Sequence, residues 1–148
     1  KCTSLTSVTI PDSVTSIGMS AFYGCTSLQY NQYDNAYYLG NEGNPYLLLV
    51  EATSRSITSC TIHEKTRFIH SDAFSACWEF TSITISDSVT SIGEGAFYGC
   101  TALTGIAIPE GVTAEEAAEK GSVLVTRELP ETRSWKHLLR FEKGVWVL

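Results

Sequence analysis

Residue types that support catalysis occur in this chain of 148 residues, but their spacing matches no catalytic motif. His63-Glu64 begins like the zinc-protease motif H-E-x-x-H, yet Arg67 stands where the second histidine must bind the metal. The abundant serines never occur in the G-x-S-x-G turn that exposes a nucleophile, and no sequence motif indicates a nucleophile paired with His137 in the tail. The sequence therefore predicts that the protein is not an enzyme and holds neither a metal nor a cofactor.

The five cysteines follow a fixed period instead of a ligand or redox motif. No C-x-x-C pair occurs, which argues against zinc and thiol–disulfide chemistry. Cys2 and Cys25 are 23 residues apart, and so are Cys77 and Cys100, while Cys60 replaces a core valine in a different column. Small buried thiols explain such a column best. The alternative is a disulfide between two cysteines of this column. If consecutive periods stack as neighbouring strands, they lie about 4.8 Å apart, which is within the reach of a disulfide.

This cysteine period belongs to an internal repeat. The segments that start at Cys2 and Cys77 share the columns D-S-V-T-S-I-G and A-F-Y-G. A copy that starts at Cys25 returns to this register at Ile57, and it is 52 residues long, 29 more than the regular period. A fourth copy begins at Cys100 and soon stops. One unit cannot bury its own apolar side, whereas about three stacked units can.

Each copy predicts two short extended pieces and a turn. Leu5, Val8 and Ile10 end in the apolar–polar alternation of a half-buried strand, and residues 14–17 form a second piece. Residues 20–22 predict a brief helical turn that places a phenylalanine ring inward. Stacking the copies would align identical residues in ladders, namely Ile10, Ile62, Ile85 and Ile108, and Phe22, Phe74 and Phe97.

Three pairs of residues distinguish this repeat from other leucine-rich repeats. They are Ile-Gly, Ala-Phe and Gly-Cys, which in the first copy are Ile17-Gly18, Ala21-Phe22 and Gly24-Cys25. Over roughly residues 1–112 the chain resembles the bacterial BspA-like surface leucine-rich repeat protein family. The resemblance implies a right-handed leucine-rich repeat solenoid of parallel β-strands with short helical turns. It also implies a non-catalytic binding module that is secreted or displayed at the cell surface. His63 and His70 depart from the proline and glycine columns, and we interpret them as solvent-facing turn residues.

The inserted residues predict a β-hairpin. The β-prone runs 36–39 and 46–50 are separated by residues 40–45, which are rich in glycine, asparagine and proline. Five of the seven tyrosines gather here: Tyr30, Tyr33, Tyr37, Tyr38 and Tyr46. These rings either fasten the hairpin to the repeats or form a ligand-facing patch. We expect Tyr33 and Tyr37 to be the exposed rings, whereas Tyr38 and Tyr46 occupy positions that can pack inward.

The tail predicts a small α/β cap over the open end of the repeats. Thr113 and Glu116 form a capping box for a helix that ends near Lys120, a strand follows at 122–128, a second helix surrounds Trp135, and 145–148 is a final strand. The predicted division is therefore a solenoid at 1–113, with an insert at about 29–56, and a cap at 114–148. A separate interaction role for the tail is the alternative.

Charge and hydropathy exclude other classes of partner. The net charge of −6 argues against a nucleic-acid-binding protein, which relies on Lys and Arg. The longest apolar run, Tyr46 to Val50, is far shorter than the roughly 20 residues that span a bilayer. Because the sequence opens at a repeat boundary, we expect the natural protein to continue upstream of Lys1 or another molecule to cover that end.

The predicted function is recognition or adhesion, with a protein or glycan on another cell surface or matrix as the partner. Outward Ser and Thr side chains would form a hydroxyl-rich face, although such residues are also good solvent-side strand formers. The candidate binding residues are Tyr33, Tyr37, Tyr38, Tyr46, Ser7, Thr9, Ser59, Thr61, Ser82 and Thr84. The alternatives are a passive spacer and the accessory binding domain of a larger surface enzyme.

Overall fold

The computed structural model describes residues 2–104, 106–107, 113–114, 125–126, 140–142 and 145–147. This part of the chain consists of strands and turns, and within it no helix is long and apolar enough to cross a membrane. The strands are β1 (Asn31–Tyr33), β2 (Ala36–Leu39), β3 (Leu48–Ala52), β4 (Ser59–Thr61), β5 (Phe68–Ile69), β6 (Ser82–Thr84), β7 (Ser91–Ile92), β8 (Ile106–Ala107), β9 (Thr113–Ala114), β10 (Val125–Thr126), β11 (Arg140–Glu142) and β12 (Val145–Val147).

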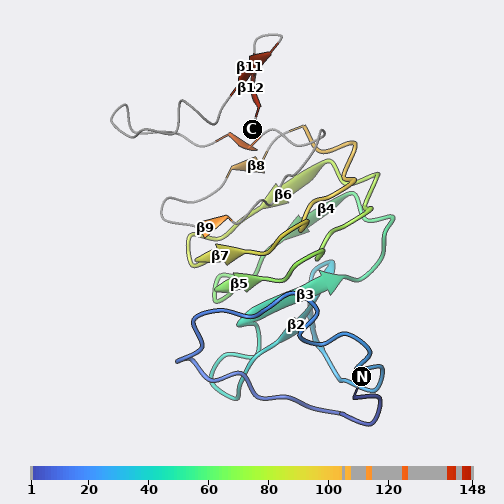
Figure 1. The fold of residues 1–148 in the computed structure, drawn as a ribbon, viewed down its shortest axis with the longest axis vertical. Coiled ribbons are helices and arrows are strands. Elements are labelled where there is room, and N and C mark those ends of the chain that lie inside the picture. Colours follow the sequence, from blue (N-terminus) through green and yellow to red (C-terminus); the bar gives the residue numbers. More distant parts are fainter. Residues whose placement is uncertain are drawn as a thin grey trace.

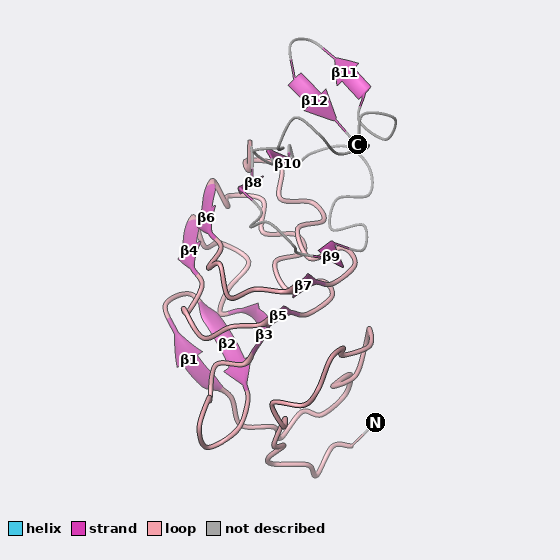
Figure 2. Ribbon diagram, turned by 90° about the vertical axis from the view of Figure 1, so that its left-hand side faces the viewer, coloured by secondary structure: helices cyan, strands magenta, loops and turns pink. Residues whose placement is uncertain are grey.

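The repeat copies stack into two parallel ladders (Figure 1). In the first ladder β4 pairs in parallel with β6, and β8 lies next along. In the second ladder β5, β7 and β9 pair in parallel. Figure 2 shows the two ladders side by side along the length of the molecule, with the turns of each copy joining them. The two extended pieces are thus confirmed as parallel strands in the later copies, whereas the first copy, residues 2–24, contains no strand.

The insert forms a three-stranded antiparallel meander that takes the place of one rung. The predicted hairpin is confirmed, because β2 and β3 pair antiparallel with Leu39 opposite Leu48. Strand β1 was not predicted; it pairs with β2 across a tight turn in which Asp34 adopts a φ of 48°. On its other side β3 pairs in parallel with β5. The insert therefore extends the second ladder where the strand of the first copy would otherwise lie.

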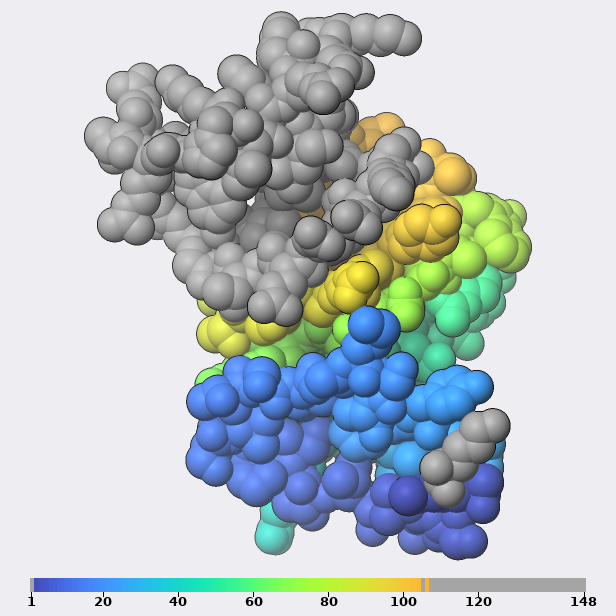
Figure 3. Space-filling view, in the orientation of Figure 1, coloured from blue at the N-terminus to red at the C-terminus, as the bar shows by residue number. Residues whose placement is uncertain are grey.

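The sheet β1-β2-β3-β5-β7-β9 separates two hydrophobic cores. Neighbouring residues of a strand point to opposite faces. Accordingly Leu49 and Ile69 belong to the core inside the repeats, while Leu48 and Phe68 belong to a second core on the other face. Residues of the first copy, including Ile10, cover this second core. In Figure 3 this blue N-terminal segment covers the end of the molecule opposite the orange residues near 100.

The first copy is therefore not the first rung of the ladders, and part of the predicted ladders is wrong. Ile10 packs in the second core and hydrogen-bonds through its backbone N–H to the carbonyl of Gly40 at 2.9 Å. Phe22 is half-buried and lies 6.1 Å from the ring of His70. Ile108 lies outside the described residues. The reason is physical: β3 already occupies the edge of β5 on which the first copy would stack.

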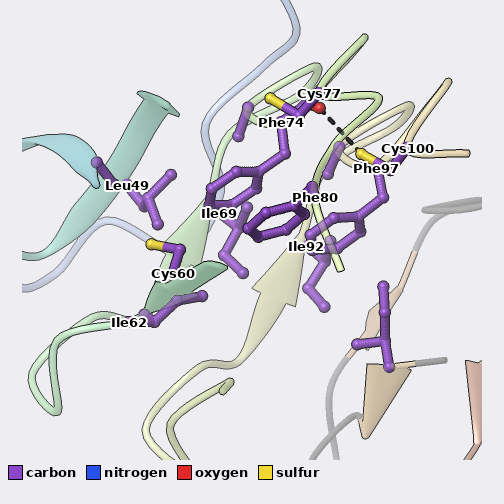
Figure 4. Packing of buried hydrophobic residues seen from close by; sticks show 14 of the residues in the cluster. Leu49, Cys60, Ile62, Ile69, Phe74, Cys77, Phe80, Ile92, Phe97 and Cys100 are labelled. Carbon is purple, nitrogen blue, oxygen red and sulfur yellow. Dashed lines mark hydrogen bonds between the residues drawn. The ribbon is translucent and has the colours of Figure 1, made fainter. Parts of the chain in front are cut away.

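Where copies do stack, the predicted ladders form. The rings of Phe74 and Phe97 are parallel within 3° at 5.5 Å, and Phe80, which was not predicted, stacks on Phe74 at 5.0 Å (Figure 4). Cys77 and Cys100 are buried free thiols, and the Cys100 thiol donates to the Phe74 carbonyl at 3.1 Å. Each described cysteine is free, but Cys2 is exposed, so the prediction that the whole column is buried is wrong for the first copy.

Turns replace the predicted brief helical segments. In the second copy the N–H groups of Ala73 and Cys77 donate to carbonyls three residues back. Asp72 and Ala76 have positive φ, and Gly95 and Gly99 repeat this geometry one copy later. Since a left-handed residue interrupts a right-handed helix, two per copy prevent helix formation.

Two strands from the C-terminal part of the chain, β9 and β10, pair with strands of the repeats. Thr113 and Ala114 form β9 opposite Ser91 and Ile92, while Glu116 and the rest of the helix predicted up to Lys120 lie outside the described residues. Within the predicted strand at 122–128 the structure describes β10, which pairs in parallel with β8, and within the predicted final strand it describes β12, which pairs with β11. The predicted helix around Trp135 lies outside the described residues.

Candidate binding surface on the insert and the first ladder

Four exposed hydroxyl side chains lie in register on the first ladder. The parallel pairing of β4 with β6 places Ser59 opposite Ser82 and Thr61 opposite Thr84. The residue between them on each strand packs against the core. We call these four residues the hydroxyl strip; it forms the face predicted from the repeat columns.

Ser7 and Thr9 do not join the hydroxyl strip, although they were predicted to continue its columns. Both are exposed, but they lie in the first copy, which packs on the far face of the other sheet. The position beside β4 is taken by the turn between β1 and β2. The prediction that Ser7 and Thr9 stack with the other four residues is therefore wrong, because the insert occupies the place beside the second copy that the first copy would take.

Two side chains of the β1–β2 turn fasten the insert to the free edge of β4. An oxygen of the Asp34 carboxylate accepts the backbone N–H of Thr61 at 2.7 Å. The Asn35 side-chain amide donates to the Ser59 carbonyl at 2.8 Å. An edge strand exposes such groups to other chains. Here side chains of the insert satisfy them, and the insert is held against the hydroxyl strip.

Three rings form an aromatic group at the end of the hydroxyl strip. Tyr46 and His63 are stacked with centroids 4.0 Å apart. Tyr33 stands edge-on to both rings, at 4.8 Å from His63 and 5.9 Å from Tyr46. Tyr33 is 39 % exposed, whereas the other two rings are half-buried. The aromatic group, Tyr33, Tyr46 and His63, thus presents one accessible ring on a base of two.

His63 was not predicted to belong to this surface, although the sequence holds the signal. Alternation along a strand puts residues 59, 61 and 63 on one face. Ile62 between them is buried and donates its N–H to the Thr84 carbonyl at 3.1 Å, so the extended chain continues past β4. His63 was not placed on the face of Ser59 and Thr61 because it was interpreted as a turn residue in the position of a proline. Both His63 and His70 are in fact half-buried.

Local hydrogen bonds fix the positions of the two stacked rings. The Nδ1 atom of His63 accepts the N–H of Lys65 at 3.1 Å, so the neutral imidazole carries its proton on Nε2. The hydroxyl of buried Thr66 donates to the Tyr46 carbonyl at 2.9 Å. The side chain of Asn44 donates to the Lys65 carbonyl at 2.8 Å. The loop before Tyr46 and the turn after His63 are therefore held together.

The remaining candidate tyrosines lie elsewhere. Tyr38 is fully buried and packs edge-on against Tyr46 at 5.6 Å, so it does not belong to the candidate surface. Burial raises the pKa of Tyr38 well above its usual range. Tyr37, expected to be exposed, is half-buried against Tyr30 at 5.8 Å. Some tyrosines thus pack within the insert, whereas Tyr33 is presented to solvent.

The surface offers hydroxyl, aromatic and imidazole groups. Among the described residues no group of three His, Cys, Asp or Glu side chains could hold a metal ion. Burial raises the pKa of Cys60 to about 12 and that of Cys100 to about 11, which keeps these thiols protonated at neutral pH. The arrangement is suited to hydrogen bonding and ring stacking on a partner.

The repeated segments with their stacked parallel strands are typical of leucine-rich repeat proteins. A family model described as the BspA type leucine rich repeat region matches residues 1–41 and 52–131 in six copies, which is well over half of the chain. The chain belongs to this BspA-type family. The match passes over residues 42–51 in the insert and reaches beyond residue 112, where the resemblance seen in the sequence ended.

Solved structures of bacterial leucine-rich repeat proteins are similar to this chain. A leucine-rich repeat protein from Eubacterium ventriosum is 27 % identical over 81 % of this chain and 36 % of its own, with a TM-score of 0.50. A leucine rich cell surface protein from Faecalibacterium prausnitzii is 32 % identical over 86 % of this chain and 34 % of its own, with a TM-score of 0.44. A leucine-rich repeat protein from T. pallidum is 18 % identical over 51 % of this chain and 47 % of its own, with a TM-score of 0.41. No curated protein matches the chain.

Proposed function

We propose that this chain is a non-catalytic recognition module, secreted or displayed at the cell surface, which binds a protein or glycan through the insert surface. The insert surface comprises the aromatic group and the hydroxyl strip together. Membership of the BspA-type repeat family supports the class of function. The absence of a catalytic motif in the sequence is consistent with it.

One observation carries the proposal. The Asp34 carboxylate accepts a hydrogen bond from the edge of β4 and the Asn35 amide donates one to it, so the insert that carries the exposed ring of Tyr33 is held against the hydroxyl strip. Tyrosine contributes a large amphipathic contact at low entropic cost, and interface energy concentrates in such residues. The insert also interrupts the repetition of the rungs, and it can therefore supply specificity that identical rungs cannot.

The experiment measures binding of the purified chain to immobilised extracellular-matrix proteins and to a glycan array. Tyr33→Ala should weaken binding by more than about 1 kcal/mol. Tyr98→Ala, at a 60 % exposed tyrosine on a repeat turn, is the matched control and should bind normally. A folded Tyr33→Ala chain that binds as well as the wild type would contradict the proposed surface. Failure of the wild type to bind any member of either panel would favour a passive spacer or an accessory domain instead.

A further inference from the structure

We propose that the insert surface takes a neutral carbohydrate chain, with one sugar ring on Tyr33 and the next along the hydroxyl strip. This rests on the proposed function and adds the chemical class of the ligand. Neither family membership nor the solved relatives assign such a ligand to these residues.

The aromatic group supplies a place for a sugar ring to stack. The face of an aromatic ring is electron-rich and attracts the polarised C–H groups on the apolar side of a sugar. Tyr33 is accessible, and its contacts with His63 at 4.8 Å and Tyr46 at 5.9 Å hold it in place before a ligand arrives. Because the ring is already positioned, binding loses little conformational entropy.

The hydroxyl strip supplies matched hydrogen-bonding partners. Each Ser or Thr hydroxyl donates one hydrogen bond and accepts two, which is the same capacity as a sugar hydroxyl. The register of β4 with β6 sets Thr61 beside Thr84 at about the 4.8 Å spacing of paired strands. Because Nδ1 of His63 accepts the Lys65 N–H, the Nε2–H is the donor that this imidazole can offer to a sugar hydroxyl.

The charges favour a neutral carbohydrate over an acidic one. The hydroxyl strip and the aromatic group contain no carboxylate and no lysine or arginine. The exposed carboxylate of Asp34, which accepts the Thr61 N–H, puts a negative charge beside the strip that would repel an acidic sugar, and the exposed Glu64 and Lys65 that follow His63 are of opposite sign. The chain as a whole carries a net charge of −6, which repels anionic glycans.

The test is a titration of the purified chain with neutral hexasaccharides (cellohexaose, laminarihexaose and mannohexaose) and with an anionic hyaluronan hexasaccharide. Saturation-transfer NMR reports the contact and calorimetry the affinity. At least one neutral hexasaccharide should bind, with an affinity that salt leaves unchanged, and the anionic one should not bind. In the wild type, intermolecular NOEs should join sugar C–H protons to the ring protons of Tyr33, and in Tyr33→Phe equivalent NOEs should reach the phenylalanine ring, because this change keeps the ring face on which the sugar stacks.

Variants then locate the site. Tyr33→Ala and His63→Ala should each raise the Kd at least about fivefold, whereas Tyr98→Ala should stay within about twofold. Thr61→Val removes one hydroxyl while keeping the shape and strand propensity of the side chain, so it should weaken binding without unfolding the chain. Melting curves of all variants identify any that fail to fold, and Thr61→Val then replaces them as the decisive variant.

Three results would overturn the inference. A neutral hexasaccharide that binds folded Tyr33→Ala and Thr61→Val as tightly as wild type would place its site elsewhere. Preference for the hyaluronan hexasaccharide would contradict the charge argument. If no hexasaccharide binds but a matrix protein binds in a Tyr33-dependent manner, the carbohydrate is wrong and the proposed recognition function stands; if neither binds, both fail.

Discussion

Two copies of the repeat have nearly the same sequence and different surroundings. The copy from Cys77 to Gly99 lies within the stack, and its Phe97 is 1 % exposed. In the copy from Cys2 to Gly24 the equivalent Phe22 is half-buried and packs over the back of the other sheet. The same holds for the matching pairs Val14 and Val89, and Ile17 and Ile92, in which the first-copy residue is half-buried and the other is buried.

The difference shows that the burial of a repeat copy depends on which copies stack against it, since two nearly identical sequences are buried to different extents. Phe97 stacks on Phe74 of the preceding copy. The first copy has no such partner, because the insert lies between it and the second copy and β3 occupies the edge of β5. This is the nearest-neighbour behaviour expected of stacked repeats. Matched substitutions in the two copies can therefore test it.

The largest difference is expected at the phenylalanine column. Phe97→Ala should destabilise the chain by roughly 3–5 kcal/mol, because it leaves a cavity beside Phe74. Phe22→Ala should cost less than half as much, since its ring is already partly in water. Denaturant unfolding of the two variants measures both values. Equal costs would mean that the first copy is stacked as a regular rung.

The cysteine column should show the same contrast in reactivity. Cys2 is exposed, whereas Cys100 is buried and its pKa is raised to about 11 by burial. At pH 8 alkylation of Cys100 should therefore be at least about 100-fold slower than that of Cys2, since the thiolate is the nucleophile. Mass spectrometry of the labelled peptides reports the two rates. Comparable rates in the folded chain would show that the column is not buried.

The raised thiol pKa also sets the direction of the pH dependence. An unfolded thiol ionises near its ordinary pKa of 9.0, while the folded Cys100 keeps its proton until about 11. The unfolded state then binds fewer protons than the folded state, so stability falls as the pH rises through this window. Below about pH 9 the thiol is protonated in both states, and Cys100 should contribute no pH dependence to the free energy of unfolding.

A glycine pair gives the next contrast. A Cβ on Gly93 would lie 2.4 Å from the backbone nitrogen of Ser71 in the preceding copy, whereas a Cβ on the equivalent Gly18 meets nothing within 4 Å. Gly93→Ala should therefore cost about 1–3 kcal/mol through overpacking. Gly18→Ala should be neutral or stabilise the chain by up to about 1 kcal/mol, because it restricts the unfolded chain. Thermal melts of the two variants should move in different directions or by clearly different amounts.

The sequence predicted the regular rungs well because each apolar column has the period of a strand. The parallel pairing of β4 with β6 and the ring stack of Phe74 and Phe97 follow directly from aligned copies. The displacement of the first copy was not predictable in the same way. It depends on β3 pairing with β5, a contact between an irregular insert and the repeat, which no column encodes.

The candidate site was predicted only in part for a related reason. The exposure of Tyr33 and the hydroxyl strip agree with alternation along strands. The contact between them depends on Asp34 and Asn35, two turn residues whose side chains reach a strand more than 20 positions away. His63 was missed because it was considered only as a replaced proline, although its spacing from Thr61 puts it on the same face.

The smallest effect on stability, and the sharpest test of the surface, is expected at the outer threonine column. Thr84 and Thr9 occupy the same column and both are exposed, so each Thr→Ala change should alter stability by less than about 0.5 kcal/mol. Their effects on binding should differ, because Thr84 lies beside Thr61 in the hydroxyl strip and Thr9 lies in the displaced copy. Thr84→Ala should weaken binding of whichever partner the wild type binds, and Thr9→Ala should not. If both variants weaken binding equally, the partner contacts the threonine column as a whole, and the first copy must then stack beside β4 when the partner is bound.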